Sequence, residues 1–379
     1  MDVGNLSDLA TGFKDLGADP RIIVMVLIGG VLIYLGIAKG FEPLLLLPIG
    51  MGIVLVNLYP PLMEGALEGR PEGILAWIYS YGIKNGIIPL LIFLGVGAMA
   101  DFTPLLSRPI FFVFGAAAQI GVFIVFLIAI AVGYFDIEEA ACVGIIGGSD
   151  GPPTVYITAI LAPQLLGPIT LAAYAYMALV PIVQPPIVRL LTTKKERAIV
   201  MKPETREVSR RATIVFPVLA FIIVAVLIPR AAPLIGMLMF GNLLNVSDVT
   251  HRLARSASTV FIDVLTFLLG LCVGALMSAE VFLRPQTLAI LGLAALAFAV
   301  STAGGVLMAK FVNLFRKEPI NPLIGAAGVS AVPMAARVAQ KLGQEANPSN
   351  FLLMHAMGPN MAGVIATSVA AGIFLQMLA

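Results

Sequence analysis

The sequence predicts an all-α polytopic membrane protein made of two inverted-topology repeats. Each repeat is expected to carry a broken or re-entrant helical hairpin, and the two hairpins are expected to meet near mid-membrane. Hydrophobic residues make up 59% of the chain and charged residues only 12%, whereas soluble proteins carry about 25% charged residues. Glycine- and proline-rich runs interrupt apolar segments at 147–153 and 321–333. Such runs cannot continue a regular helix.

Apolar segments long enough to cross a bilayer follow one another along the chain, since a helix needs roughly 20 residues to do so. We expect spans at 21–38, 42–58, 74–99, 109–134 and 168–191, and then at 212–229, 233–246, 256–277, 286–315 and 351–378. The first repeat therefore covers 1–191 with its hairpin at 138–166, and the second covers 212–379 with its hairpin at 320–343. A basic linker, 192–211, joins them.

The two halves share a pattern of glycines. Gly148 aligns with Gly325 and Gly151 with Gly328, an offset of 177 residues in both pairs (325 − 148 and 328 − 151). The acid and the base are divided between the halves, because Asp150 aligns with an alanine and Arg337 with an isoleucine. A chance likeness of glycine-rich helices is the alternative, which the shared offset disfavours.

The distribution of charges predicts the orientation of the helices. The linker 192–211 is rich in Lys and Arg and is therefore expected in the cytoplasm. The acidic loops at 64–72 and 136–139 suit the opposite side. The first hairpin then enters from outside and the second from inside, which is the inverted-repeat plan of secondary transporters. The first twenty residues lack a basic start and a cleavage motif, so we expect no cleavable signal peptide.

Asp150 is the first candidate functional residue. A carboxylate at membrane depth costs roughly 2.5–3.5 kcal/mol unless it is paired, protonated or hydrated. Broken helices beside such an acid commonly bind ions, because helix ends and freed carbonyl groups supply further ligands. The alternative is a simple Gly/Pro kink with the acid in a loop.

Oxygen-bearing side chains in the two hairpins could complete a site for a hard monovalent cation. They are Ser149, Thr154, Asn321, Ser330 and, in the last span, Asn360, which could alternatively form an interhelical hydrogen bond. Arg337 offers a planar fork that suits a carboxylate or a ureido oxygen; alternatively it anchors the chain at the interface.

Several other polar residues in apolar segments remain ambiguous. Tyr174 and Tyr176 could relay a proton, although tyrosines near span ends are more often interfacial. Asp263 is either a second ion-site acid or the partner of a polar neighbour, and Gln184 is equally open. The two histidines and two cysteines lack ligand spacing, so we expect no transition-metal site. The net charge of +2 gives no indication of a nucleic-acid partner.

Long motifs resemble the β subunit of the sodium-translocating biotin-dependent decarboxylases, the family of the oxaloacetate, methylmalonyl-CoA, glutaconyl-CoA and malonate enzymes. The matching stretches are 41–50, 144–152, 176–181, 321–337 and 355–360, and the likeness covers nearly the whole chain. The family run usually reads Gly-Ala-Asp-Gly-Pro-Thr. Here Pro153 replaces the threonine, so Ser149 or Thr154 is expected to supply a hydroxyl instead.

The resemblance implies a function that spacing alone does not. A β subunit of this family decarboxylates carboxybiotin carried by a partner, exports Na⁺ and consumes a proton. The implied partners are a biotin carrier, a carboxyltransferase α subunit and a small membrane γ or δ subunit, in a complex that contains a homo-oligomer of this chain. By this resemblance the functional residues are Asp150, Tyr176, Asn321, Gly325, Ser330 and Arg337.

Location and alternatives complete the sequence-based interpretation. We expect a multi-pass protein of a prokaryotic inner membrane. The chain has no biotin attachment motif, so carboxybiotin must come from a partner. The alternative function is a stand-alone secondary transporter, either a cation/proton antiporter or an anion symporter, because function does not follow from fold alone.

Overall fold

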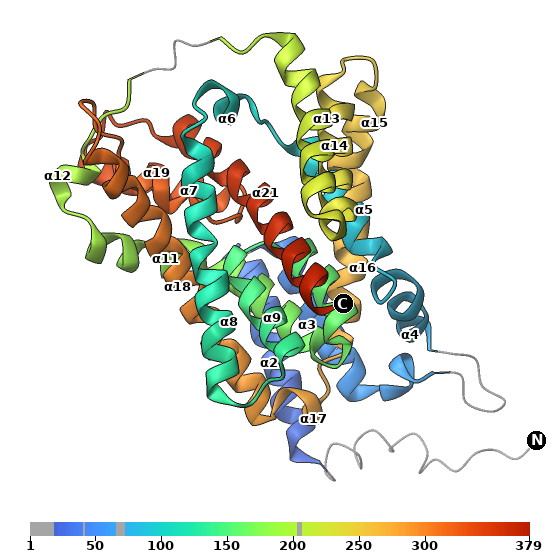
Figure 1. Ribbon diagram of the computed structural model, residues 1–379. Coiled ribbons are helices and arrows are strands. Elements are labelled where there is room, and N and C mark those ends of the chain that lie inside the picture. The colour runs from blue at the N-terminus through green and yellow to red at the C-terminus, as the bar shows by residue number, and fades with distance from the viewer. Residues whose placement is uncertain (1–18, 41, 66–72, 203–206) are drawn as a thin grey trace, which may run out of the picture.

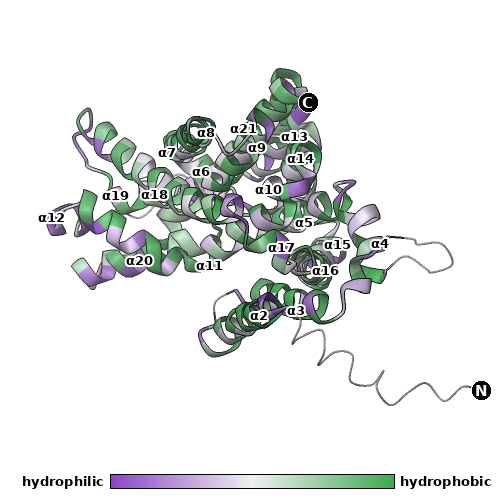
Figure 2. Cartoon of the chain, turned by 90° about the horizontal axis from the view of Figure 1, so that it is seen from below, coloured by the Kyte–Doolittle hydropathy of each residue, from purple (hydrophilic) through white to green (hydrophobic). Residues whose placement is uncertain are grey.

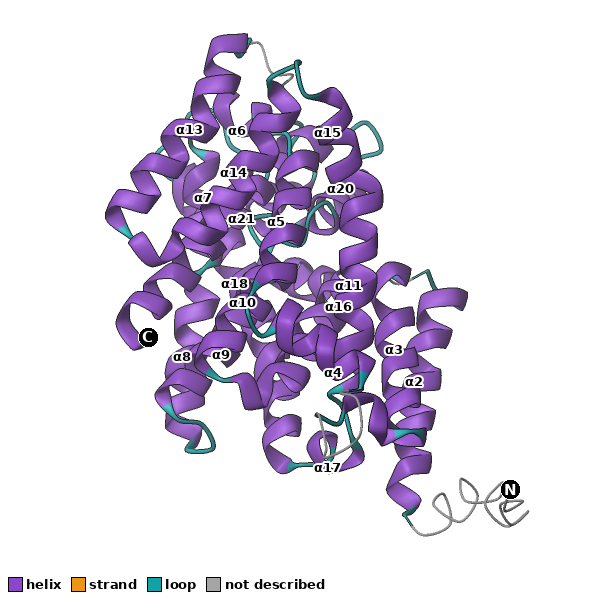
Figure 3. Ribbon diagram, turned by 90° about the vertical axis from the view of Figure 1, so that its right-hand side faces the viewer, coloured by secondary structure: helices purple, strands orange, loops and turns teal. Residues whose placement is uncertain are grey.

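The computed structural model describes residues 19–40, 42–65, 73–202 and 207–379, except for the side chain of residue 178. Three sequence-based predictions lie partly outside these residues. They concern the polar N-terminal stretch, the acidic segment after residue 65 and the middle of the linker. Every element of the described chain is helical, and no strand occurs within it (Figures 1 and 3).

The helices of the first half follow the predicted spans closely. They are α2 (Pro20–Ala38), α3 (Pro43–Leu58), α4 (Ile74–Ile78), α5 (Ile87–Met99), α6 (Thr103–Ser107), α7 (Phe111–Ala118), α8 (Ile120–Val132), α9 (Ile137–Ile145), α10 (Gly151–Leu161) and α11 (Leu166–Leu191). Short 3-10 or π segments, η2 (Pro60–Met63), η3 (Tyr79–Ile83), η4 (Ile146–Gly148) and η5 (Pro163–Leu165), lie between them.

The second half is built from the same kinds of element. Its helices are α12 (Lys194–Arg197), α13 (Arg210–Leu227), α14 (Ala232–Val246), α15 (His251–Ser256), α16 (Ile262–Ala275), α17 (Ala279–Phe282), α18 (Pro285–Asn313), α19 (Pro322–Ala326), α20 (Met334–Ala346) and α21 (Leu353–Leu378). Two short segments, η6 (Pro229–Ala231) and η7 (Ala257–Phe261), connect them.

Six helical stretches in the described residues are long and apolar enough to cross a membrane, or eight if each of two bent pairs forms one span. This confirms a multi-pass membrane protein. One bent pair, Ile74–Ile83 and Ile87–Met99, turns by 64°, where the sequence predicts a single element at 74–99. Gly86, with φ of 74°, lies at this bend and precedes α5 in a left-handed conformation that glycine adopts readily.

Two large hydrophobic cores and one small cluster, formed by Leu94, Ala98 and Ala257, occur in the described residues. The larger core contains α7–α9, α18–α21 and parts of α11 and α14. The smaller core is built around α2, α3, α5 and α16 and also takes in parts of α10 and α11. In Figure 2 the α2–α3 pair lies apart from the main body, and α16 lies between this pair and α5. The candidate site described below lies where the two cores meet.

The helix ends gather in two groups, as the charge pattern predicts. In Figure 1, α6, the start of α13 and α15 lie at the top, whereas α17 and the loop after α8 lie at the bottom. The top carries the linker and is the predicted cytoplasmic end. The inverted relation between the two halves remains a prediction.

Candidate functional site

The first hairpin is broken at the position that the sequence predicts. Asp136 caps α9 by accepting a hydrogen bond from the backbone N–H of Glu139, whose own carboxylate reaches back to Asp136 N–H. The helix then tightens into η4 and ends at Ser149, which has φ of 57°. Asp150 follows with extended backbone and begins α10. The break therefore places both side chains at the tip of the hairpin.

Asp150 lies at this tip with an unsatisfied carboxylate. Only 6% of the residue is exposed, and its Oδ2 atom has no hydrogen-bond partner among the described residues. The Ser149 hydroxyl is also buried and unpartnered. Thr154 does not contribute a free hydroxyl, since its Oγ1 donates to the Asp150 carbonyl over 2.6 Å. An unpaired buried polar atom is costly, so two neighbouring acceptors in this state indicate a site for a ligand.

The second hairpin meets the first directly. The backbone N–H of Ser330, in the break between α19 and α20, donates to the Gly148 carbonyl over 2.9 Å. The Ser330 hydroxyl lies 2.8 Å from Thr367 Oγ1 on α21, which in turn lies 3.3 Å from Gln119 Oε1 at the α7–α8 break. The expected meeting of the two broken runs is thus confirmed as a contact between them.

Asn360 holds the second tip in place. Its Nδ2 donates to the carbonyls of Ala327 and Val329, over 3.1 and 2.6 Å. Its Oδ1 is buried without a partner. Carboxylate, hydroxyl and amide oxygens are the ligands that hard cations prefer. Asp150, Ser149 and Asn360 therefore each present an unsatisfied oxygen of the required chemistry near the tips.

A cavity of about 260 Å³ lies beside these tips. Asp150 and Ser330 of the two hairpins line it, together with Tyr174, Leu45, Ile92 and Ile262 of the smaller core. Two more carboxylates, Glu42 before α3 and Asp263 on α16, also face this cavity. Met99 and Ala100 mark its extension towards the predicted cytoplasmic end.

Arg337 lies in the first turn of α20 with an exposed side chain. Its guanidinium is close enough to act electrostatically on Glu42, which lines the cavity. Glu42 is therefore the residue that links the candidate base electrostatically to the cavity that contains the candidate acid. Arg337 itself does not appear among the residues that line it.

Asn321 and Gly325, both predicted to take part in the ion site, instead hold the second hairpin in place. Asn321 caps α19, with Oδ1 accepting from Leu323 N–H, and its Nδ2 donates to the carbonyls of Arg197 and Ile199 in the linker. Gly325 packs so tightly on α18 that an added Cβ would overlap the Gly305 carbonyl oxygen. Neither residue lines the cavity.

Tyr176, the predicted proton carrier, is half-buried and donates to the Leu291 carbonyl on α18 over 2.9 Å. It does not line the cavity. Tyr174 does, and it packs so closely on Gly151 that an added Cβ there would overlap its ring. Gln184 donates to the Ala326 carbonyl and links α11 to the second hairpin.

Four residues near the site were not singled out as site candidates from the sequence. They are Glu42, Gln119, Thr367 and Tyr174, of which the last was considered but regarded as interfacial. Gln119 carried a signal, because it is the only strongly polar side chain in the apolar stretch 111–132. Glu42 is the first residue of the predicted span 42–58 and lies in the family-like stretch 41–50, but the sequence does not indicate that its carboxylate faces the hairpin tips.

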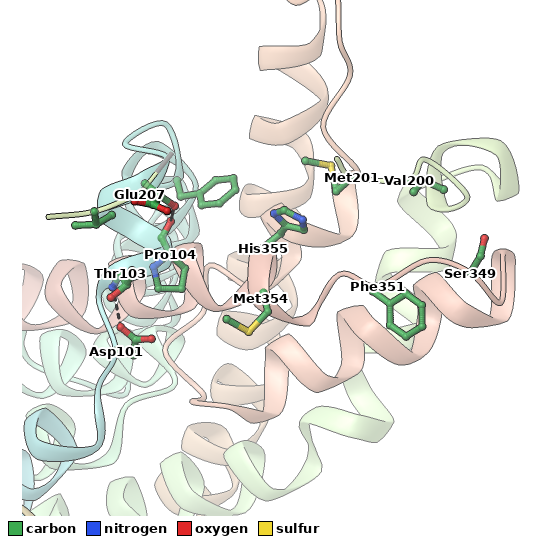
Figure 4. Close-up of a pocket in the computed structure, with 13 residues that line it drawn as sticks. Asp101, Thr103, Pro104, Val200, Met201, Glu207, Ser349, Phe351, Met354 and His355 are labelled. Carbon is green, nitrogen blue, oxygen red and sulfur yellow. Dashed lines mark hydrogen bonds between the residues drawn. The ribbon is translucent and has the colours of Figure 1, made fainter. Parts of the chain in front are cut away.

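A second cavity of about 650 Å³ opens at the linker end (Figure 4). Asp101, Thr103 and Glu207 gather on one side of it and Ser349 and Phe351 on the other, with the remaining wall formed by α6, α7, the linker and the start of α21. Asp101 Oδ1 accepts from Thr103 N–H over 2.9 Å. In the described residues no group of three or more His, Cys, Asp or Glu side chains could hold a metal ion.

Comparison with known proteins decides the family. Residues 21–378 match the family model described as Na⁺-transporting oxaloacetate decarboxylase beta subunit. The chain belongs to this family. It is 51% identical to the methylmalonyl-CoA decarboxylase subunit beta of Propionigenium modestum, with 97% of each chain covered.

Other relatives indicate the same family. The methylmalonyl-CoA decarboxylase subunit beta of Veillonella parvula is 52% identical over 94% of this chain and 92% of its own. An oxaloacetate decarboxylase beta chain of Salmonella typhi is 47% identical over 96% of both chains. The chain is thus a membrane subunit of a Na⁺-transporting decarboxylase. The comparisons support this interpretation and not a stand-alone transporter.

Proposed function

We propose that this subunit decarboxylates carboxybiotin delivered by a partner and uses the free energy released to export Na⁺, with consumption of one proton. The observation that carries the proposal is the buried, unpartnered carboxylate of Asp150 at the meeting point of two broken hairpins. Family membership supports the overall reaction, and the cavity beside Asp150 supports the place where it is coupled to ion movement.

The Na⁺ ion is the transported substrate and binds at the hairpin tips. Asp150 supplies the charge, and Ser149, Ser330 and Asn360 supply neutral oxygens. Thr154 acts indirectly, by hydrogen bonding to the Asp150 carbonyl. Asn321 attaches the second hairpin to the linker, and Gly325 allows it to pack closely on α18. Both residues thereby hold the tip of this hairpin at the site.

Carboxybiotin approaches from the cytoplasmic end, where Glu42, Met99 and Ala100 line the cavity. The planar guanidinium of Arg337 suits its carboxylate or ureido oxygen. Loss of CO₂ leaves a ureido nitrogen that takes up one proton. Tyr176 and Asp150 are the candidates for carrying it, and the role of Tyr176 rests on the family resemblance.

Coupling requires that the ion site face one side of the membrane at a time. The site lies where two hydrophobic cores meet, so a shift of the elements of one core against those of the other would change its access. Such a shift between two states is the general basis of coupled transport.

The partners follow from the proposed reaction. A biotin carrier and a carboxyltransferase α subunit must load and present the carboxyl group, and a small membrane γ or δ subunit completes the complex, in which this chain forms a homo-oligomer. The linker, with the 650 Å³ cavity beside it, is the proposed docking surface.

The proposal is tested with the intact complex and free carboxybiotin, by following CO₂ release against Na⁺ concentration. Asp150→Asn is expected to abolish Na⁺-dependent release. Glu280→Gln is the matched control, because it removes an exposed carboxylate on α17 that lies outside the cavity, and it should behave as wild type. Full Na⁺-dependent activity in Asp150→Asn would contradict the proposal, as would Na⁺/H⁺ exchange without any decarboxylation.

A further inference from the structure

The site cavity is also lined by an acid outside the two hairpins that the proposed reaction does not use. Asp263 and, one helical turn later, Thr266 both line the cavity from α16. The Asp263 side chain is exposed although it lies within a helical stretch, His251–Ala275, apolar enough to cross a membrane. An acid in such a helix is expensive in lipid, and here it lines a cavity that the carboxylates of Glu42 and Asp150 also line.

The local backbone explains why Asp263 points to the cavity. The π-helical segment η7 (Ala257–Phe261) ends immediately before α16. A π turn holds one residue more than an α turn, so it changes the direction of the side chains that follow, and such turns are frequent at functional sites. Gly95 of α5 packs against the Ala257 carbonyl and Ile262. Ile262 is thus held in the smaller core, while its neighbour Asp263 lines the cavity.

No described residue forms a hydrogen bond or an ion pair with Asp263. In the same cavity, Asp150 is more than nine-tenths buried with an unpartnered Oδ2. Asp150, Asp263 and Glu42 all line the same space, and no Lys, Arg or His among the described residues lines it with them. The excess of negative charge favours a cation as the ligand.

The acids do not form one compact site, because no group of three acids, histidines or cysteines among the described residues is close enough to hold a single metal ion. Asp150 directly precedes α10 and Asp263 lies on α16, two separate helices that both pack against α5. Two separate positions for one cation fit this arrangement better than one shared position.

We propose that Asp263, with the Thr266 hydroxyl, forms a second binding position for the transported monovalent cation, on the α16 wall of the cavity. The cation occupies this position on its way between the cytoplasmic end of the cavity and Asp150. The inference rests on the proposed function, because it takes Asp150 as the ion site that Asp263 supplies.

The test is the Na⁺ dependence of decarboxylation by the intact complex carrying Asp263→Asn. The loss of a carboxylate that concentrates the cation is expected to raise the half-saturating Na⁺ concentration by roughly threefold to tenfold, with the maximal rate at saturating Na⁺ retained. Asp263→Glu is expected to restore the wild-type concentration, which a purely structural role would not predict. Glu280→Gln again serves as the control for loss of a carboxylate elsewhere.

Two results would overturn the inference. One is an unchanged half-saturating Na⁺ concentration in Asp263→Asn. The other is a fall in maximal rate with no change in that concentration, since this points to a structural or catalytic role. Both differ from failure of the proposed function, which is measured separately as retained Na⁺-dependent activity in Asp150→Asn.

Discussion

Gly325 provides a sharp test of how the second hairpin is held. An alanine Cβ at this position would overlap the Gly305 carbonyl oxygen and come within 2.8 Å of the Ala309 side chain. The obstacle is largely backbone, which cannot rotate away. Overpacking of this kind costs about 1–3 kcal/mol, and the better helix propensity of alanine recovers only about 0.5–1 kcal/mol. We therefore expect Gly325→Ala to lower the stability of the complex by about 1–2 kcal/mol.

Gly292→Ala is the matched control. Gly292 lies on α18, as Gly305 does, but a Cβ there would meet nothing within 4 Å. This variant is expected to be as stable as wild type or slightly more stable. The assay is thermal unfolding of the purified complex, followed in parallel with Na⁺-dependent decarboxylation.

The comparison also separates two roles for Gly325. Alanine keeps the backbone carbonyl, so a role limited to ion coordination by that oxygen predicts no loss of stability. A role in close helix packing predicts loss of both stability and activity. Equal stability of the Gly325→Ala and Gly292→Ala complexes would refute the packing argument.

Three further predictions concern other parts of the site. Asn360→Ala leaves the Ala327 and Val329 carbonyls without their hydrogen-bond donor. It should lower the stability of the complex by about 1–3 kcal/mol and raise the half-saturating Na⁺ concentration. An unchanged Na⁺ dependence would show that Asn360 is not part of the ion site. Tyr176→Phe removes the hydrogen bond to the Leu291 carbonyl, which contributes about 1 kcal/mol to stability. The variant should also slow decarboxylation at saturating Na⁺. A loss of stability without slower decarboxylation would exclude a role of Tyr176 in proton delivery. Burial acts to raise the pKa of Glu196, but hydrogen bonds from Thr193 and Lys310 outweigh it and lower that pKa below its usual value. The stabilisation from these bonds is therefore present at neutral pH and is lost as the pH falls through this lowered pKa. Hydrogen-exchange protection at 193–199 should persist at pH 6 and disappear only below the ordinary glutamate pKa of about 4.3. Loss of protection at a higher pH would contradict this assignment.

The helices and the broken hairpins could be predicted because composition determines them. A chain of this hydropathy has to satisfy its backbone hydrogen bonds in helices, and the Gly and Pro residues at 147–153 and 321–333 prevent those helices from continuing. The spans at 21–38 and 168–191 correspond closely to α2 and α11. The bend at Gly86 was not predicted, although Lys84, Asn85 and Gly86 interrupt the apolar stretch 74–99 and mark the break.

The composition of the site was less predictable. Tyr174 and Tyr176 are two residues apart on one helix and so point in different directions, and packing of α11 against its neighbours decides which one reaches the cavity. Asn321 looks like a ligand in sequence, yet the end of α19 and the linker use its polar atoms. Glu42 joins the cavity only because the smaller core places the α2–α3 connection beside it.

The central claim is that Asp150 couples decarboxylation to Na⁺ movement. The most direct measurement follows CO₂ release and Na⁺ flux together, in proteoliposomes that contain the complete complex with either wild-type chain or Asp150→Asn. The account predicts that the wild type moves Na⁺ only while carboxybiotin is consumed and that Asp150→Asn loses this coupled flux. Undiminished Na⁺ flux coupled to decarboxylation in Asp150→Asn would contradict the account.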